Sequence, residues 1–126
     1  METGLVFDRR GGAIYWHLPR GRTQSYLPDS QQLWRVLWEY HQEGLLGGVA
    51  HTHPWSGEAS PSHTDVTTFA AVEAGLGKRL VWPIVTFTEV RYFHWVGPER
   101  LDYAEMEVRR FRINKALIAE LRRFSQ

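Results

Sequence analysis

The sequence contains no cysteine, and this absence excludes several classes of protein. A chain without thiols has no disulfide framework, no thiolate zinc site, no iron–sulfur cluster and no cysteine nucleophile. The zinc deaminases, which need a Cys-x-x-Cys segment, are excluded with them. Any transition-metal site in this chain must therefore use imidazole and carboxylate ligands.

Long apolar runs and a strong net charge are also missing. The apolar stretch 80–85 is broken by Pro83 and is far too short to span a bilayer, and no signal-like segment opens the chain. We therefore expect a cytoplasmic protein that makes no membrane contact. Lys and Arg total 15 against 14 Asp and Glu, for a net charge of +1, which argues against nucleic-acid binding through bulk charge.

The chain has 126 residues, the length of one domain, and we expect residues 1–126 to form a single domain. Its composition, 43% hydrophobic and 23% charged, is that of an ordinary folded protein and excludes wholesale disorder. Tryptophan and histidine are the residue types that stand out in this composition, with six of each.

Hydrophobic periodicity predicts strands that alternate with helices. Strands are expected at 2–7, 13–17, 45–53, 80–87 and 90–96, and helices from Asp29 or Ser30 to Gly44, from Ser62 to Gly75, and over 113–124. The segment 101–108 fits either a strand or a helix. This order predicts an α/β fold, with a single mixed β-sheet flanked by helices.

Aromatic and basic residues leave two further alternatives open. An aromatic cluster is expected to lie in the core, although part of it would suit a partner or homodimer surface if one side of the sheet were uncovered. Its members are Trp34, Trp38, Trp82, Phe93 and Trp95. The basic stretch from Arg109 to Arg123 is expected to be solvated, with an acidic partner or RNA as the alternative.

Two short segments carry the chemistry. Residues 51–54 read His-Thr-His-Pro at the end of an expected strand, and residues 62–65 read Ser-His-Thr-Asp at an expected helix start. Side chains two apart on a strand point to the same face, so His51 and His53 can bind one ion. The loop between the segments lets Asp65 supply an oxygen from another direction. Two imidazoles and one carboxylate leave one position open, as in catalytic zinc sites.

These segments resemble the signature of the JAMM (JAB/MPN-type) zinc metalloproteases, in which His-(Ser/Thr)-His-Pro is followed by Ser-x-x-Asp. The family also carries an upstream glutamate at the head of its first strand. Here that place is taken by Glu2, in the run Glu-Thr-Gly-Leu-Val. The resemblance implies a prokaryotic-type JAB domain, whose architecture is like that of the cytidine deaminases.

The resemblance also implies a mechanism and a substrate. Zinc would be held by His51, His53 and Asp65, Glu2 would act as the general base on a water molecule, and Ser62 would help stabilise the oxyanion. Active family members cleave isopeptide or peptide bonds after the Gly-Gly tail of ubiquitin-like proteins, including prokaryotic sulfur-carrier relatives. Such a protein is the expected partner, and the tail could add as a strand beside the active-site loop.

This sequence departs from the family pattern near Glu2. The spacing between Glu2 and Gly4 is one residue short, and we expect the helix that usually precedes the first strand to be missing. Alternative bases are Glu58 in the loop and Glu39 or Glu43 on the first helix. The alternative function is a non-catalytic scaffold or a binding module for ubiquitin-like proteins.

Overall fold

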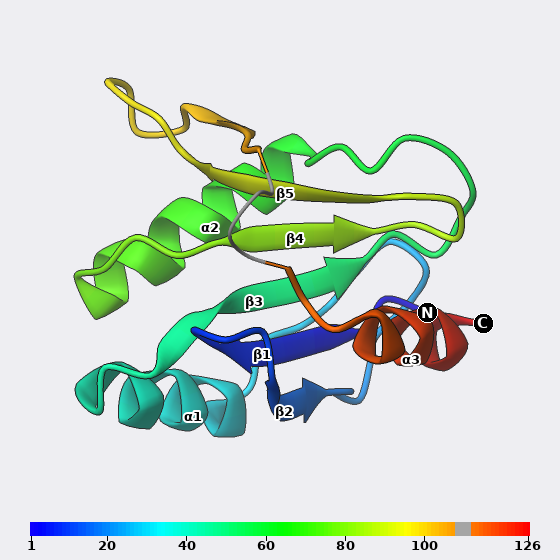
Figure 1. Cartoon of the computed structure of the whole chain (residues 1–126), viewed down its shortest axis with the longest axis horizontal. Helices are drawn as coiled ribbons and strands as arrows, with labels where there is room; N and C mark the ends of the chain where they lie inside the picture. Colours follow the sequence, from blue (N-terminus) through cyan, green and yellow to red (C-terminus); the bar gives the residue numbers. More distant parts are fainter. Residues whose placement is uncertain (108–111) are drawn as a thin grey trace.

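The computed structural model describes residues 1–107 and 112–126, which form a six-stranded sheet in the order β2-β1-β3-β4-β5-β6 and three helices (Figure 1). The elements are β1 (Gly4–Asp8), β2 (Ala13–His17), α1 (Gln31–Gln42), β3 (Leu46–Thr52), α2 (His63–Leu76), β4 (Trp82–Val85), β5 (Val90–Trp95), β6 (Tyr103–Glu105) and α3 (Lys115–Ser125).

The sheet is mixed. Strands β3 and β4 pair in parallel through the crossover helix α2, and the other neighbouring strands pair antiparallel. The predicted α/β fold with one mixed sheet and flanking helices is thus confirmed. Strand β6 lies within the ambiguous segment 101–108, whose last residue, Val108, is outside the described residues.

The helix starts follow the predicted caps. Ser30 rather than Asp29 caps α1, because its Oγ accepts a hydrogen bond from the backbone N–H of Leu33 at 3.1 Å. Ser62 caps α2, as the sequence indicates, and Gly77 ends that helix in the left-handed conformation with φ 69°.

Helices cover both faces of the sheet, so the central strand β1 is buried on both sides. Val6 faces the core beneath α1 and α2, where it packs with Leu37 and Phe69. Leu5 faces the opposite core, which includes Leu121 of α3. Figure 1 shows α3 in front of the sheet, with the two chain ends side by side.

Strand β3 approaches its neighbours too closely for side chains at its start. A Cβ added at Gly48 would lie 1.9 Å from the carbonyl oxygen of Val81, and one at Gly47 would lie 2.4 Å from the carbonyl oxygen of Asp8. The Gly-Gly pair is therefore required by the close packing of backbone around this strand.

Not every predicted core aromatic is buried. Trp82 and Phe93 are buried and Trp34 and Trp95 are partly exposed, but Trp38 is 50% exposed, so its assignment to the core is wrong. On α1 its ring lies 5.8 Å from the ring of His41, one turn later. The homodimer stays a prediction.

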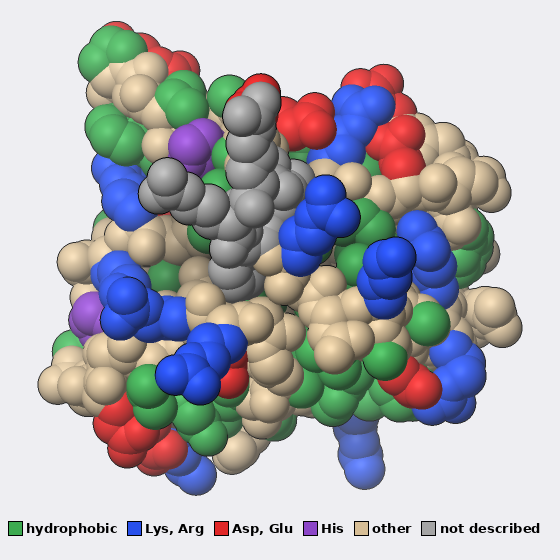
Figure 2. Space-filling view, viewed as in Figure 1, with side chains coloured by type: hydrophobic (Ala, Val, Ile, Leu, Met, Phe, Trp, Pro, Cys, Tyr) green, Lys and Arg blue, Asp and Glu red, His purple; other side chains and the backbone are tan. Residues whose placement is uncertain are grey.

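The basic C-terminal stretch is described only in part, because its first residue, Arg109, lies outside the described residues. On the face that carries α3, Lys and Arg side chains are spread among acidic and apolar ones (Figure 2). No helix in the described part of the chain is long and apolar enough to cross a membrane.

A buried carboxylate, Glu73 on α2, ties that helix to strands β4 and β6. It is 3% exposed and accepts hydrogen bonds from the Leu80 backbone N–H at 2.8 Å and from Trp82 Nε1 at 2.9 Å. Arg79 forms an ion pair with it at 2.9 Å, and the Tyr103 hydroxyl donates to it as well. This cluster fixes α2, the helix that presents Asp65.

We predict that Glu73→Ala lowers the free energy of unfolding by about 3 kcal/mol, because two buried N–H donors lose their acceptor. Urea denaturation measures the change. The control is Glu120→Ala, which removes an exposed ion pair with Arg123 and should cost under about 0.5 kcal/mol. Equal losses in the two variants would contradict the role of Glu73.

We predict that stability falls at alkaline pH through Tyr103. Burial and the neighbouring Glu73 carboxylate raise the pKa of Tyr103. Its stabilising contribution is therefore complete below the ordinary tyrosine pKa of about 10, and is lost as the pH rises above that value. Between pH 9 and 11, the free energy of unfolding should fall more steeply with pH for the natural protein than for Tyr103→Phe. An equal dependence on pH in the two proteins would refute this.

Candidate metal centre

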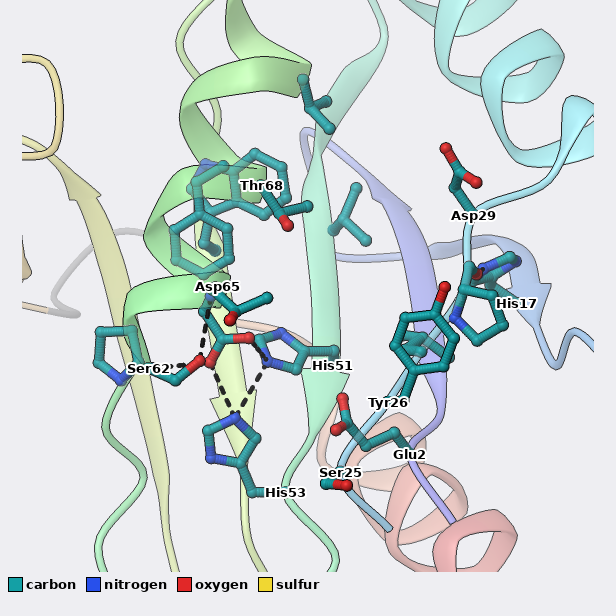
Figure 3. Close-up of a pocket in the computed structure, with 18 of the residues that line it drawn as sticks. Glu2, His17, Ser25, Tyr26, Asp29, His51, His53, Ser62, Asp65 and Thr68 are labelled. Carbon is teal, nitrogen blue, oxygen red and sulfur yellow. Dashed lines mark hydrogen bonds and ion pairs between the residues drawn. The ribbon is translucent and has the colours of Figure 1, made fainter. Parts of the chain in front are cut away.

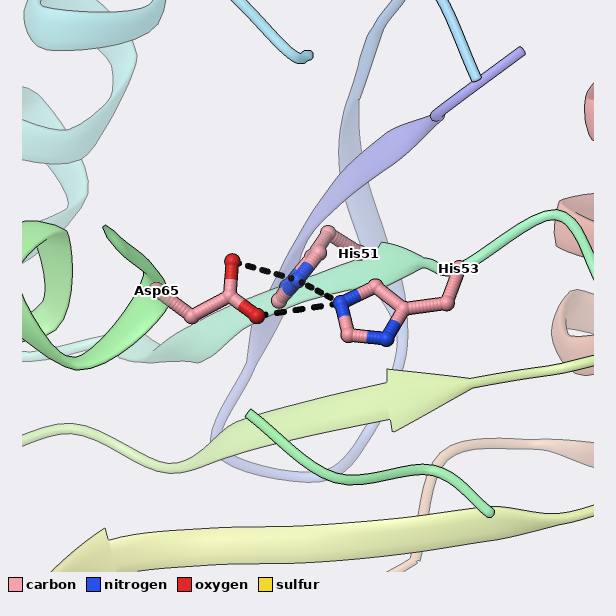
Figure 4. A group of neighbouring side chains, drawn as sticks. All are labelled: His51, His53 and Asp65. Carbon is pink, nitrogen blue, oxygen red and sulfur yellow. Dashed lines mark hydrogen bonds and ion pairs between the residues drawn. The ribbon is translucent and has the colours of Figure 1, made fainter. Parts of the chain in front are cut away.

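The carboxyl end of β3 brings two imidazoles together (Figure 4). His51 is the penultimate residue of the strand, and His53 follows one residue after its end, so both rings project from the same face. Their Nε2 atoms lie 3.2 Å apart, and the two residues are 7% and 6% exposed.

A carboxylate from α2 meets both rings. Asp65 Oδ1 lies 3.2 Å from His51 Nε2, and Asp65 Oδ2 lies 3.0 Å from His53 Nε2. The Nε2 atoms of His51 and His53 therefore point to one small region, which the Asp65 carboxylate also borders. The sequence predicted this convergence of His51, His53 and Asp65, and the structure brings the three residues together.

The spacing of these atoms fits a tetrahedral metal ion. Ligands at 2.0–2.1 Å from a tetrahedral zinc ion are separated by about 3.3 Å from one another. The Nε2–Nε2 separation of 3.2 Å is close to that value, and each nitrogen has one Asp65 oxygen at a similar distance, Oδ1 at 3.2 Å from His51 and Oδ2 at 3.0 Å from His53. One ligand atom from each residue lies within 4.8 Å of the others. The group could hold a metal ion, and zinc is compatible with its imidazole and carboxylate chemistry.

Local structure at the start of α2 aims Asp65 at the rings. The Ser62 Oγ accepts a hydrogen bond from the Asp65 backbone N–H at 3.0 Å, and Asp65 Oδ2 accepts one from the Ser62 backbone N–H at 2.9 Å. This reciprocal pair is a capping box, which fixes the first turn of the helix. The same residues therefore begin the helix and orient a ligand.

Electrostatics make the site anionic. Burial alone would raise the pKa of Asp65, but the hydrogen bonds from His51 and His53 outweigh it and hold the pKa well below its usual range. Burial opposes protonation of His51, yet the carboxylates of Asp65 and Glu2 raise its pKa. Two carboxylates beside two imidazoles create a local demand for positive charge, which a divalent cation would meet.

Strand pairing places Glu2 beside the same cluster. In the antiparallel register of β1 and β3, Gly4 lies opposite His51, and the Thr52 N–H donates to the Thr3 carbonyl at 3.0 Å. Continuing this register sets Glu2 opposite His53 with its side chain on the same face. Figure 3 shows the Glu2 carboxylate directed toward the two histidines.

The position of Glu2 is fixed although it lies next to the chain end. It is 7% exposed, its backbone N–H donates to the Thr23 carbonyl at 2.7 Å, and Arg22 Nη1 donates to its carbonyl at 3.2 Å. Burial raises the pKa of Glu2; His51 and His53 lower it, while Asp65 adds to the rise. A carboxylate with a raised pKa is well suited to accept a proton near neutral pH.

The other acids named from the sequence are farther from this arrangement. Glu58 lines the cleft, but its side chain is 67% exposed and pairs with Arg91 at 3.0 Å. Glu39 and Glu43 are exposed at α1 and its C-terminal cap, and neither lines the cleft. Glu2 is thus the buried acid beside the histidines.

Two aromatic rings hold the imidazoles in place. The Trp55 ring stacks on His53, with centroids 4.8 Å apart and an angle of 26° between the planes. Phe69 of α2 meets His51 edge-on at 6.1 Å. Trp55 is 45% exposed and lines the cleft, so part of its ring stays accessible to a ligand.

A buried hydroxyl cluster behind β3 was missed by the sequence analysis. Thr52, between the two histidines, faces the opposite side of the sheet, where its Oγ1 accepts from the Thr3 N–H at 2.8 Å. Ser125 Oγ of α3 lies 2.7 Å from Thr52 Oγ1 and 2.9 Å from Thr3 Oγ1. Strand alternation could have placed Thr3 and Thr52 on that face, but no sequence signal pairs them with a residue so distant in the chain.

The group formed by His51, His53 and Asp65 opens into a cleft of about 690 Å³. Its lining includes Glu2, His51, His53, Ser62 and Asp65, so every residue assigned to the site from the sequence borders one cavity (Figure 3). It also includes Ser25 and Tyr26, from a loop to which the sequence analysis gave no role.

Comparison with protein families and with curated proteins assigns no family to this chain, so the site is assigned from its residues alone. No protein-family model matches the chain, and no curated protein sequence matches it.

We predict that the natural protein retains about one zinc ion per chain after dialysis and that His51→Ala retains almost none, because two remaining ligands hold zinc weakly. Metal analysis and the metal-dependent rise in melting temperature measure both effects. The matched control is His63→Ala, which changes an exposed histidine at the first position of α2, between Ser62 and Asp65. Equal zinc loss in both variants would argue against the site.

Proposed function

We propose that this protein is a zinc-dependent hydrolase of the JAMM (JAB/MPN) type, which cleaves isopeptide or peptide bonds after the Gly-Gly tail of ubiquitin-like or sulfur-carrier proteins. The observation that carries the proposal is the convergence of His51, His53 and Asp65 beside the buried carboxylate of Glu2. The mixed sheet with helices on both faces is compatible with a JAB/MPN fold.

The ligand set favours a catalytic over a structural metal. Structural zinc sites use four protein ligands, whereas catalytic sites use three and keep a position for water or substrate. His51, His53 and Asp65 number three, and they border an open cleft. Bound zinc supplies a Lewis acid, which at neutral pH acidifies water and polarises a carbonyl group.

The remaining residues have distinct roles in amide hydrolysis. Glu2 accepts a proton from the attacking water at its carboxylate and returns a proton to the nitrogen that leaves. The oxygen of water bonds to the carbonyl carbon, the carbon–nitrogen bond breaks, and a carboxylic acid and an amine are released. Burial of Glu2 supports this role, because it raises the pKa of the carboxylate.

Ser62 has a suitable position for stabilising the oxyanion. In the capping box its hydroxyl oxygen is the acceptor, so the hydroxyl proton can be donated to a substrate oxygen. Ser62 is exposed to the cleft that Glu2 and the histidines line. The same hydroxyl would thereby cap α2 and serve the reaction.

The Gly-Gly tail is the substrate that the resemblance at residues 51–65 implies. An extended tail without bulky side chains can approach a carboxylate and a metal site closely. The alternative of a non-catalytic scaffold does not account for a buried glutamate directed at three potential ligands. The two functions differ in one measurable property, which is turnover.

We predict that Glu2→Gln lowers turnover of a Gly-Gly-linked fusion protein by 10²- to 10⁴-fold, the usual range for loss of a general base, and leaves zinc content unchanged. Cleavage is followed by gel electrophoresis and metal content by elemental analysis. The matched variant is Glu58→Gln, which changes the exposed acid of the same cleft and should alter turnover by less than about threefold.

The results separate the alternatives. Loss of turnover in Glu58→Gln but not in Glu2→Gln would assign the base to Glu58. A protein that binds zinc but cleaves no amide substrate would be the scaffold, and the hydrolase proposal would be rejected.

A further inference from the structure

The cleft continues well beyond the atoms needed for hydrolysis. Along α2 its lining runs from Asp65 at the metal centre to Val72, seven residues later. At a rise of 1.5 Å per residue this is about 10 Å. An extended peptide advances about 3.3–3.6 Å per residue, so this length accommodates about three residues of a substrate.

The walls of this extension are mostly apolar. They include Leu33 and Trp34 of α1, Val49 on the floor from β3, and Phe69 and Val72 of α2, with Thr68 as a polar member. Leu33, Trp34 and Val49 are each only partly buried, although Val49 belongs to a central strand. Helices α1 and α2 thus leave apolar surface open between them.

The extension is narrowed where the two helices meet. A Cβ added at Gly75 of α2 would lie 3.5 Å from the Trp34 ring, so the indole packs against that helix. Gly75 is ten residues after Asp65, or about 15 Å along the helix. The metal centre is therefore at one end of the cleft and the Trp34 indole is near the other.

Charge limits what can occupy the cleft. Among the described residues that line it there is no Lys or Arg, and its charged side chains outside the metal centre are Asp29 and Glu58. A free carboxylate would find no counter-ion there. An apolar side chain would instead be transferred from water onto apolar walls, which is favourable because apolar surface is removed from water.

We propose that this extension is a specificity site that binds a bulky apolar side chain of a peptide substrate, within about three residues of the scissile amide. The inference rests on the proposed hydrolase function and refines it: the substrate has a large apolar residue near its cleaved bond, and glycine alone does not satisfy the site. Glycine has no side chain to cover Leu33, Trp34 or Val49, whereas leucine or phenylalanine does.

The test uses zinc-loaded protein and internally quenched peptides of glycine with a single leucine at each position in turn. Mass spectrometry identifies the cleaved bond. We expect kcat/KM at least tenfold higher when leucine lies within three residues of that bond than for the all-glycine peptide. Equal cleavage of all the peptides would overturn the inference and leave the hydrolase proposal standing.

Two matched variants place the preference in the cleft. Ala71 and Ala74 are both exposed on α2, but only Ala71 lines the cleft. Ala71→Trp should fill the cleft and reduce the leucine preference to threefold or less, and Ala74→Trp should retain it. Melting curves of both variants detect any loss of stability. Val49→Thr, which keeps the side-chain shape, provides a second, milder change with the same expected direction.

A binding measurement distinguishes failure of the inference from failure of the proposed function. Calorimetry compares acetyl-trileucine amide with acetyl-triglycine amide on the metal-free protein. Preferential binding of the leucine peptide, lost in Ala71→Trp, with no hydrolysis of any peptide would support the apolar site and reject the hydrolase. Absence of both binding and hydrolysis would reject the two together.

Discussion

Two imidazole nitrogens and a carboxylate are held within 3.2 Å of one another where β3 ends and α2 begins. These polar groups are nearly desolvated and lie close together. The arrangement is therefore stable only if each group has a hydrogen-bond partner or a ligand and if the negative charge is compensated. Asp65 is oriented by a capping box and the rings by strand geometry and aromatic stacking. The rest of the structure serves to maintain this convergence.

The elements behind the site come from both ends of the chain. Strand β1 pairs with β3, so that Glu2 lies beside His53, and α3 packs on the reverse face. There the Ser125 hydroxyl contacts the hydroxyls of Thr3, which follows Glu2, and of Thr52, which lies between His51 and His53. The buried carboxylate of Glu73 holds α2 against β4 through its hydrogen bond from Trp82. Stability and site geometry therefore depend on the same contacts.

The sequence predicted the features that depend on local pattern. The alternation of side chains along β3 and the helix cap at Ser62 predicted that His51, His53 and Asp65 would meet. A strand end and a helix start that are connected by one loop have few possible arrangements. The mixed sheet followed from the order of elements. Exposure of Trp38 was not predicted, because helical periodicity places it at the margin of the apolar face. The Ser125 contact, the loop at Tyr26 and the depth of the cleft depend on tertiary packing between distant segments, for which one sequence contains no periodic signal.

The cleft joins a polar end that can perform chemistry to an apolar extension that can select a side chain, as in many small-molecule and peptide sites. The chemistry requires an ion at the polar end, and X-ray absorption at the zinc edge of the purified protein tests that requirement most directly. The account predicts a four-coordinate ion with nitrogen or oxygen neighbours at about 2.0–2.1 Å and the outer-shell scattering of two imidazoles. A six-coordinate hydrated ion without imidazole scattering would contradict it.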